Sequence, residues 1–307
     1  MGEFMNLIFK EIEKYIDGSK VKYNEPMSKH TTLKVGGNAD VLVVPSTIED
    51  VKNVLSFAKK EGIPVTVIGN GSKLLVLDKG LRGIVIKLSS KFADVNINEE
   101  YVTVNAGMSL PRLAIVAKDN SLSGLEFAAG IPGNVGGAVY MNAGAYGSEM
   151  ASVIEEVTYI DDELNVQTIS KQECKFGYRQ SIFRGSKYVI LSTKLKLKKG
   201  NKQEIEELMK TNNDARRAKQ PLEYPNAGST FKRPEGYFVG KLIDDLGLKG
   251  YSIGGAQIST KHSGFIVNTG SATAADVLNL INYIKIKVLQ ANNVQLEEEI
   301  IILGEQE

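Results

Sequence analysis

The sequence contains few of the residues that build disulfide frameworks and metal sites. Its 307 residues include one cysteine, Cys174, and two histidines. A single cysteine excludes an internal disulfide, and so few ligands offer no metal cluster. The longest apolar runs have the length of strands, well short of the roughly eighteen residues that span a bilayer. No basic segment followed by an apolar one opens the chain. These absences predict a cytoplasmic protein that binds no metal and inserts into no membrane.

An excess of charge of one sign is missing as well. The chain has 37 basic and 36 acidic residues, which gives a formal net charge of +1. A nearly neutral chain lacks the basic field that attracts nucleic acid, so no such partner is predicted. Apolar residues at 42% and charged residues at 24% are typical of a globular protein, and the length is enough for two or three domains.

Glycine is concentrated in two loops. The stretch from Gly130 to Gly147 reads GIPGNVGGAVYMNAGAYG, with six glycines in eighteen positions. Glycines let the backbone approach a ligand, and exposed N–H groups bind phosphate. No Lys-Ser/Thr follows these glycines and no G-x-G-x-x-G opens a strand–helix unit, so neither a P-loop nor a Rossmann fingerprint is present. The stretch predicts a phosphate-binding loop of another kind, and an ordinary glycine-rich turn is the alternative.

A second loop, residues 69–73 with the sequence GNGSK, follows a short strand. Two such loops about sixty residues apart, one after an early strand and one before a strand-rich segment, suit a long ligand. A dinucleotide with a central pyrophosphate would contact both of them.

The hydrophobic pattern predicts an α+β protein. Two helices have clear start signals: one begins at Ser46 and Thr47 with acidic residues following, and the other begins at Thr273 with Asp276 at the third helical position. Pro221 and Pro225 mark the expected domain boundary. The other expected helices are 6–17, one capped by Ser109, 203–219 and 237–246. The expected strands are 41–44, 64–68, 84–88, 92–97, 101–105, 153–160, 166–169, 188–197, 255–258, 265–268 and 300–303.

Beyond these patterns, a series of motifs resembles one enzyme family. In order along the chain they are residues 30–37 (HTTLKVGG), 69–72 (GNGS), 130–147, 177–183 (GYRQSIF), 226–234 (NAGSTFKRP), 253–256 (IGGA), Lys261-His262 and 296–300 (LEEEI). Each motif alone is weak, but together they resemble the UDP-N-acetylenolpyruvoylglucosamine reductases, and the short segment between Gly177 and Pro225 resembles their type II branch.

The resemblance implies an FAD-binding fold of the vanillyl-alcohol-oxidase (PCMH) type in two subdomains, followed by a C-terminal α+β substrate domain. The corresponding ranges are 1–200 for the FAD-binding region, divided at about residue 80, and 201–307 for the substrate domain. It also implies non-covalent FAD, NADPH as co-substrate, UDP-N-acetylglucosamine enolpyruvate as substrate, a role in peptidoglycan synthesis, and a monomer or weak homodimer.

Carried over residue by residue, the family's flavin contacts fall in the two glycine loops. Two positions depart from the usual family pattern, since Lys73 replaces an asparagine and Asn134 replaces a serine or threonine. Lys73 is expected to add a charge-assisted contact to the pyrophosphate, and Asn134 to supply an amide in place of a hydroxyl. The expected set is Gly69, Asn70, Gly71, Ser72, Lys73, Gly130, Pro132, Gly133, Asn134, Gly136, Gly137, Asn142, Gly144 and Ala145.

The resemblance also assigns three catalytic residues. Arg179 carries a permanently charged planar fork that suits a carboxylate, although a lone arginine is more often part of an ordinary ion pair. Ser229 corresponds to the family's proton donor, a role that needs help from neighbours because a serine is a weak acid. Glu299 belongs to an acidic run of the kind that usually faces solvent, yet it corresponds to the catalytic carboxylate. An unpaired, ionised Glu299 would repel an anionic substrate.

Four further residues are expected to contact the nucleotide sugar or NADPH: Tyr178, Lys219, Lys261 and His262. For Lys219 the alternative is a charge that compensates the dipole at the end of a helix. Two other functions remain open. One is a flavoprotein oxidase of the same fold, although neither glycine loop has a His or Cys for covalent flavin attachment. The other is a non-enzymatic nucleotide-sugar binding module.

Overall fold

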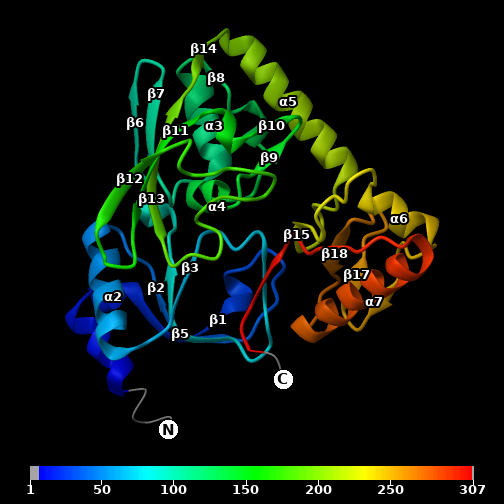
Figure 1. Cartoon of the computed structure of the whole chain (residues 1–307), viewed down its shortest axis with the longest axis horizontal. Helices are drawn as coiled ribbons and strands as arrows, with labels where there is room; N and C mark the ends of the chain where they lie inside the picture. Colours follow the sequence, from blue (N-terminus) through cyan, green and yellow to red (C-terminus); the bar gives the residue numbers. More distant parts are fainter. Residues whose placement is uncertain (1–6, 306–307) are drawn as a thin grey trace. The chain divides into compact units, whose positions relative to one another are not determined.

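The computed structural model describes residues 7–305, which form two compact units (Figure 1). Each unit collects segments that are far apart in the sequence. The first unit comprises the residues up to 23 together with 41–70 and 83–215, and the second comprises 24–40, 71–82 and the residues from 216 onward. The chain therefore passes from one unit to the other several times before the second unit is complete.

The largest sheet belongs to the first unit and is antiparallel, with the strand order β12-β11-β13-β7-β6. In β13, Leu195 is buried while Lys194 is half-buried and Lys196 exposed. This alternation gives the strand one solvated face and one face in the core. The strands are β6 (Val95–Asn98), β7 (Tyr101–Asn105), β11 (Ile154–Ile160), β12 (Val166–Ser170) and β13 (Val189–Lys196).

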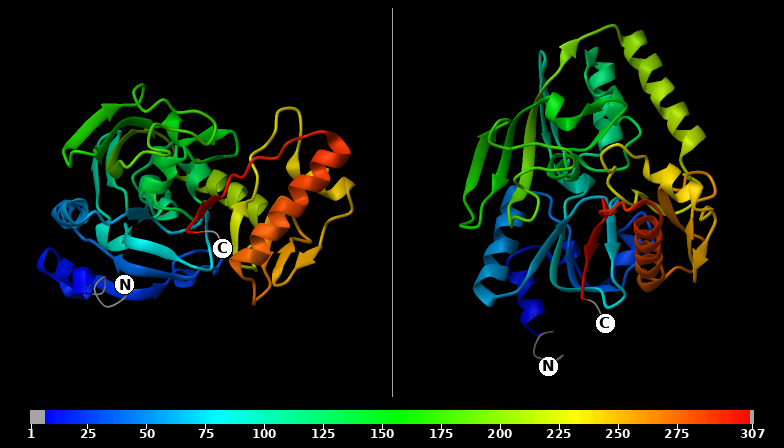
Figure 2. Two further views of the ribbon diagram at one scale, coloured as in Figure 1. Left: turned by 60° about the horizontal axis from the view of Figure 1, so that its bottom comes forward. Right: turned by 45° about the vertical axis from the view of Figure 1, so that its right-hand side comes forward.

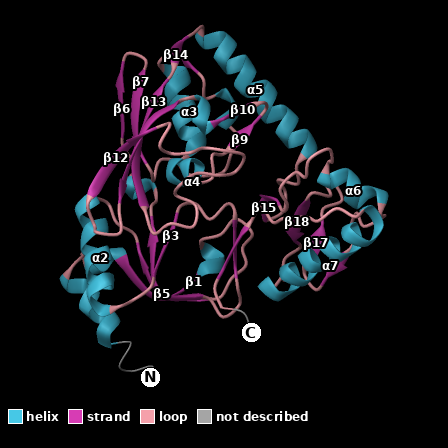
Figure 3. Cartoon of the chain, viewed as in Figure 1, coloured by secondary structure: helices cyan, strands magenta, loops and turns pink. Residues whose placement is uncertain are grey.

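Helices and short strand pairs complete this unit (Figure 3). Helix α3 (Leu110–Asp119) follows Ser109 at the expected N-cap position and has Pro111 in its first turn. Helix α4 (Val135–Tyr140) packs on β13 within the segment expected to be a loop. The short pairs are β8 (Leu122–Ser123) with β14 (Lys198–Lys199), and β9 (Gly144–Ala145) with β10 (Ser148–Glu149). One core of buried side chains extends through the unit and includes Val102, Leu113, Val139 and Leu191.

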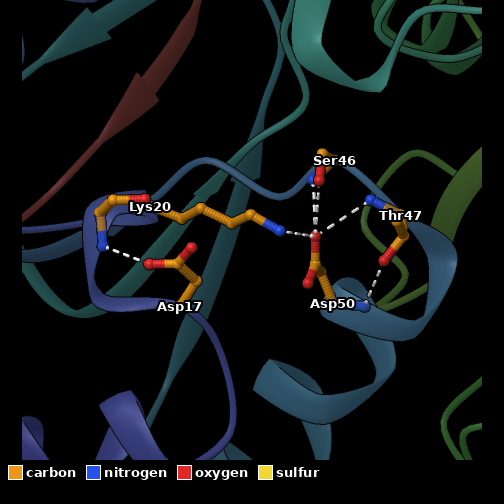
Figure 4. Close-up of polar contacts among 6 residues, drawn as sticks. Asp17, Lys20, Ser46, Thr47 and Asp50 are labelled. Carbon is orange, nitrogen blue, oxygen red and sulfur yellow. Dashed lines mark hydrogen bonds and ion pairs between the residues drawn. The ribbon is translucent and has the colours of Figure 1, made fainter.

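Helix α2 (Ile48–Glu61) begins with a capping box between Thr47 and Asp50, as the sequence predicts. The Asp50 carboxylate accepts hydrogen bonds from Ser46 and from the Thr47 N–H, and it pairs with Lys20 at 2.7 Å (Figure 4). Burial favours the neutral acid, but the Lys20 ammonium and the N–H donors prevail and lower the pKa of Asp50 to about 2. The start of α2 is therefore fixed to the segment around Lys20 by a half-buried ion pair.

A four-stranded sheet has the order β1-β2-β5-β3, and β3 runs parallel to β5. Three of its strands contain residues of both units, because the chain crosses the boundary inside them. The strands are β1 (Val21–Pro26), β2 (Asn38–Val43), β3 (Val65–Ile68) and β5 (Leu81–Lys87).

The second unit contains an antiparallel sheet of order β15-β18-β17-β16, on which α7 packs (Figure 2). Its elements are β15 (Asn226–Ser229), α6 (Val239–Asp245), β16 (Ser252–Ile253), β17 (Ala256–Ile258), β18 (Phe265–Asn268) and α7 (Ala274–Asn292). Helix α7 starts with the predicted capping box of Thr273 and Asp276, and it buries an apolar face formed by Val277, Ile281, Ile284 and Val288.

The last strand, β19 (Ile301–Leu303), pairs in parallel with β4 (Leu74–Val76), which directly follows the first glycine loop. Leu75 and Leu77 are buried in the core of the second unit, and so are Leu33 and Val35 from the segment 24–40. The C-terminal segment therefore depends on early parts of the chain for its core.

Most expected elements are present with bounds shifted by a few residues. The first expected helix begins at residue 6, outside the described residues; residues 7–10 are α-helical and Glu11–Lys14 form a 3-10 helix. Helix α5 (Lys202–Lys219) has the expected length, with residues in both units. The expected strand 92–97 is shorter, because Ser90–Phe92 form a 3-10 turn before β6. The other 3-10 helices are Gly18–Lys20, Met27–Lys29, Glu126–Ala128 and Met150–Ser152.

The compact units differ in extent from the predicted functional ranges 1–200 and 201–307. Those ranges concern which ligand each part binds, and they stay a prediction. Of the helices formed by residues 7–305, none combines the length and the apolar character required to cross a membrane.

Candidate functional site

The two glycine loops meet within the first unit. The Asn70 side chain donates from Nδ2 to the Pro132 carbonyl at 2.7 Å. A Cβ atom built on Gly69 would lie 3.4 Å from Cβ of Asn134. Because Asn70 comes from the first loop and Pro132 from the second, segments more than sixty residues apart form one surface, as the sequence predicts for a shared ligand.

The second loop is fixed from behind by internal hydrogen bonds. Asn134 is buried and donates from Nδ2 to the Leu88 carbonyl at 2.8 Å. It occupies the N-cap position of α4, but its side chain makes no capping hydrogen bond there. The N–H groups of Val135 and Gly136 donate to the Met108 and Ala106 carbonyls, both at 2.9 Å. The Asn134 amide, expected to contact the flavin phosphates, thus uses one of its donors within the protein. The start of α4 is held by the segment before α3.

The loop nevertheless leaves room for a ligand at its outer face. A Cβ atom on Gly137 would meet nothing within 4 Å, whereas one on Gly136 would lie 2.8 Å from Cβ of Ala106. One glycine therefore allows close packing inside the fold, and the other keeps the surface open. An open glycine-lined surface that joins two loops fits the diphosphate of a dinucleotide, so the residues present fit FAD.

The end of the second loop is joined to the turn that carries Arg179. Asn142 is fully buried, with Nδ2 donating to the Gly177 carbonyl at 3.0 Å and Oδ1 accepting from the Ala151 N–H at 2.9 Å. Gly144 lies in β9, where a Cβ atom would come within 2.6 Å of the Ser148 carbonyl oxygen. Ala145 follows it in the same short strand. The arrangement gives Asn142 and Gly144 a structural role in addition to any contact with a ligand.

Arg179 lies in a tight turn closed by two backbone hydrogen bonds between Gly177 and Gln180. Its φ is 54°, at the turn position where glycine or asparagine is usual. The guanidinium donates to the Gly144 carbonyl at 3.1 Å and lies 4.9 Å from the ring centre of Tyr178, which is 53% exposed. The turn thus presents a cation and an aromatic ring beside the end of the second glycine loop.

In the second unit, the first glycine loop continues through Gly71, Ser72 and Lys73. Gly71 has a φ of +66°, and a Cβ atom there would lie 2.1 Å from the His30 carbonyl oxygen. Its own carbonyl accepts a hydrogen bond from the Thr32 N–H at 3.2 Å. Only glycine fits this close approach between the two earliest motifs of the sequence.

Two of the three predicted catalytic residues come together in this unit. The Glu299 N–H donates to the Thr230 carbonyl at 2.8 Å, so Glu299 lies beside the end of β15 where Ser229 stands. The Glu299 side chain is buried, unlike the exposed Glu297 and the half-buried Glu298 of the same acidic run. The acidic run is therefore not a uniform solvated face.

One lysine joins both residues. The Lys73 ammonium pairs with Oε1 of Glu299 at 2.8 Å and donates to the Ser229 carbonyl at 2.7 Å. The sequence assigned Lys73 to the flavin phosphates, and nothing in the local pattern indicated a contact with residues more than 150 positions later. The only signal in the sequence is the lysine itself, at a position where the family usually has an asparagine; it marks the position but does not indicate its partners.

The remaining residues of the second unit have identified surroundings. Lys219 is exposed at the end of α5, and the Lys261 ammonium donates to the Arg217 carbonyl at 2.7 Å near the same helix end. Both lysines suit the helix dipole, which was the alternative for Lys219. His262 is half-buried, and its Nδ1 accepts from the Gly264 N–H at 3.1 Å. Burial lowers the pKa of His262, which favours a neutral ring.

The predicted residues therefore divide between the units. Residues 69 and 70, the residues from 130 to 145, Tyr178 and Arg179 belong to the first unit. Residues 71–73, Lys219, Ser229, Lys261, His262 and Glu299 belong to the second. Within the units, the structure brings together the two glycine loops and, separately, Lys73, Ser229 and Glu299.

Comparison with known proteins defines the class. Residues 39–170 match the family model described as an FAD binding domain, and residues 220–303 match that of the UDP-N-acetylenolpyruvoylglucosamine reductase C-terminal domain. A solved structure of Phl p 4.0202, a glucose dehydrogenase, shares the fold over 64% of this chain and 44% of that one, with 14% identity and a TM-score of 0.51. The class is an α+β flavoprotein with the FAD-binding fold of the vanillyl-alcohol-oxidase type, which confirms the predicted fold.

Two similar proteins narrow this to one family. The UDP-N-acetylenolpyruvoylglucosamine reductase of Caldanaerobacter subterraneus subsp. tengcongensis is 49% identical over 97% of this chain and 99% of its own length. The crystal structure of the corresponding Thermus caldophilus reductase has 38% identity and a TM-score of 0.80, covering 92% of this chain and 98% of that one. The chain belongs to the UDP-N-acetylenolpyruvoylglucosamine reductase family.

Proposed function

We propose that this chain reduces the enolpyruvyl group of UDP-N-acetylglucosamine enolpyruvate to the lactyl ether of UDP-N-acetylmuramic acid, a step of peptidoglycan precursor synthesis. The observation that carries the proposal is the match to reductases of this name over nearly the whole chain, together with the buried Glu299 beside Ser229. FAD is the cofactor and NADPH the co-substrate.

The residues that would hold FAD lie along the two glycine loops, namely Gly69, Asn70, Gly133 and Gly137, with Gly71 and Ser72 continuing the first loop. FAD bound there would supply hydride transfer, from NADPH to the methylene carbon of the enolpyruvyl group. Stabilisation of the developing charge and protonation of the carbon are assigned to side chains of this protein.

Hydride addition leaves negative charge on the neighbouring carbon and its carboxylate, and that carbon must then be protonated. The Arg179 guanidinium, a permanent cation with a planar fork, is suited to stabilise the carboxylate and the developing charge. The Ser229 hydroxyl donates the proton to the carbon. Glu299 assists stabilisation of the intermediate or its protonation as a carboxylate paired with the Lys73 ammonium, which keeps it from repelling the developing charge.

An anaerobic visible spectrum tests the proposal. The purified protein is expected to show a flavin band that bleaches with NADPH and returns when UDP-N-acetylglucosamine enolpyruvate is added. A band that returns only with air would keep the fold and identify an oxidase instead. A colourless protein that does not take up FAD would leave a nucleotide-sugar binding module.

Ser229→Ala tests the assigned proton donor in the same experiment. Flavin binding and reduction by NADPH are expected to persist, while reoxidation by the sugar nucleotide slows by about 10²–10⁴-fold because the general acid is missing. Ser252→Ala, which removes an exposed hydroxyl from the same sheet, is the matched control. Reoxidation of the Ser229→Ala enzyme at the wild-type rate would remove Ser229 from this role.

A further inference from the structure

Lys73 is the point at which three segments of the second unit converge. Its own carbonyl accepts a hydrogen bond from the Ile301 N–H at 2.8 Å, next to the parallel pairing of β4 with β19. The segment around Glu299 pairs in turn with the residues after Ser229, through the Glu299 N–H and a bridge between Phe231 and Glu298. The loop, the end of β15 and the start of β19 therefore lie side by side at Lys73.

The ammonium of Lys73 binds both predicted catalytic residues at once. It lies 2.8 Å from Oε1 of Glu299 and 2.7 Å from the Ser229 carbonyl oxygen. The two side chains of this ion pair are only 16% and 8% exposed, so water screens their attraction weakly. A Cβ atom on Gly228 would lie 3.3 Å from the ammonium, so the glycine leaves the space that this contact uses.

The positive charge of Lys73 reduces the repulsion expected between the Glu299 carboxylate and an anionic substrate. The substrate carries a carboxylate on the enolpyruvyl group, and hydride addition increases its negative charge. A buried Glu299 carboxylate without a cation would repel that charge. The ammonium balances the carboxylate, and its second hydrogen bond fixes the backbone that carries the Ser229 hydroxyl.

We propose that Lys73 is a positioning residue for the reduction of the enolpyruvyl group: it holds Glu299 and the Ser229 backbone in place and cancels the charge of Glu299. The inference rests on the proposed function. It differs from the expectation from sequence, in which Lys73 contacts the flavin pyrophosphate. Loss of the Lys73 charge should weaken FAD binding under that expectation and leave it nearly unchanged under the present proposal.

The first test compares Lys73→Met with Lys73→Arg and with Lys241→Met, which removes an exposed ion pair from the same unit. For Lys73→Met we expect the FAD dissociation constant and the rate of flavin reduction by NADPH to stay within about threefold of wild type. Reoxidation by the sugar nucleotide is expected to slow by about 100-fold, as for a displaced catalytic group. Lys73→Arg should recover part of that loss, and Lys241→Met should show none. A tenfold weaker FAD affinity, or reoxidation at the wild-type rate, would overturn the proposal.

The second test asks whether Lys73 acts through Glu299. Lys73→Met is combined with Glu299→Gln, which removes both charges and so avoids a buried carboxylate without its cation. If Lys73 works by holding Glu299, adding Lys73→Met to Glu299→Gln should slow reoxidation by less than about threefold, against about 100-fold in wild type. Thermal unfolding is compared for four FAD-free proteins: wild type, Lys73→Met, Glu299→Gln and the double variant. The loss of unfolding free energy caused by Lys73→Met should likewise be smaller when Glu299→Gln is already present. Independent, multiplicative effects in either measurement would contradict the inference.

The test of the role of Lys73 gives a result that can be separated from the test of the proposed function. If the sugar nucleotide fails to reoxidise wild-type flavin, the proposed reaction is wrong. The coupling of Lys73 with Glu299 in unfolding and the FAD affinity of Lys73→Met are measured without the substrate. They therefore show separately whether Lys73 serves Glu299 or the flavin.

Discussion

Arg179 occupies a backbone conformation that residues with a side chain rarely adopt. Its φ of 54° lies in the left-handed region, and the turn between Gly177 and Gln180 requires it. Such strain costs about 1–3 kcal/mol and persists where the surroundings or the function over-determine it. Glycine would fit the turn better, so the presence of arginine here is consistent with selection for its guanidinium rather than for stability.

Comparison of Arg179→Gly with Arg179→Ala separates backbone strain from chemistry. Alanine keeps the left-handed strain of roughly 1–2 kcal/mol. Glycine removes this strain, but its unfolded chain has more conformational freedom, which lowers the stability of the folded state by roughly 0.5–1 kcal/mol. We expect the glycine variant to be more stable than the alanine variant by about 1 kcal/mol in chemical denaturation. Both variants should lose about 10²–10³-fold in reoxidation by the sugar nucleotide. Equal stability of the two variants would show that the turn changes conformation when the arginine is removed.

At the scale of elements, helices with local signals are the most predictable part of this fold. Helices α2 and α7 both have capping boxes and apolar faces, and both begin within a few residues of the expected position. In contrast, α4 contains two adjacent glycines that disfavour a helix interior, and packing on β13 overrides that preference. Strand β4 has three residues, and its partner β19 lies more than two hundred positions later, so no local pattern indicates it.

In the candidate site, too, some features have a signal in the sequence and others do not. Motifs identify Ser229 and Glu299, and the structure brings them together through backbone pairing. The Lys73 contact with both was not predictable, because it depends on the pairing of β4 with β19 rather than on the sequence around Lys73. The roles of Arg179, Ser229 and Glu299 stay predictions until they are measured.

The capping box of α2 predicts a specific acid sensitivity. The pKa of Asp50 is lowered from 3.8 to about 2, because Lys20 and the N–H donors outweigh the effect of burial. A carboxyl whose pKa is lower in the folded state stabilises the fold above the unfolded value and loses that contribution as pH falls through the folded one. About 2 kcal/mol should therefore disappear between about pH 5 and pH 2.

Asp50→Asn checks this contribution, because the amide keeps the shape of the side chain but does not titrate. Denaturant unfolding of both proteins between pH 7 and pH 3 should show wild type more stable by about 2 kcal/mol at pH 7, with the difference shrinking as pH falls. Glu49→Gln changes a neighbouring acid of the first turn and serves as the control. A difference that does not depend on pH would mean that the Lys20 pair adds nothing to stability.

At the scale of the whole molecule, the interleaved order of the segments decides which pieces of the chain are able to fold alone. The core of the second unit includes Leu33, Val35, Leu75 and Leu77, all at most 5% exposed. Burial of each such side chain contributes roughly 1.5–3 kcal/mol, or roughly 6–12 kcal/mol together. That sum is comparable to the total stability of a typical domain.

The fragment 201–307, which matches the predicted substrate domain, is therefore expected to stay unfolded. It lacks those four side chains, it leaves β19 without its partner β4, and it removes Asp78, whose carboxylate accepts hydrogen bonds from the first N–H groups of α7. Circular dichroism during heating should show no cooperative transition. The control joins 24–40 and 71–82 to 216–307 with flexible linkers, which restores the core and should restore the transition. Cooperative unfolding of the bare fragment would show that the C-terminal sheet and α7 suffice, and that the early segments add to a fold that already exists without them.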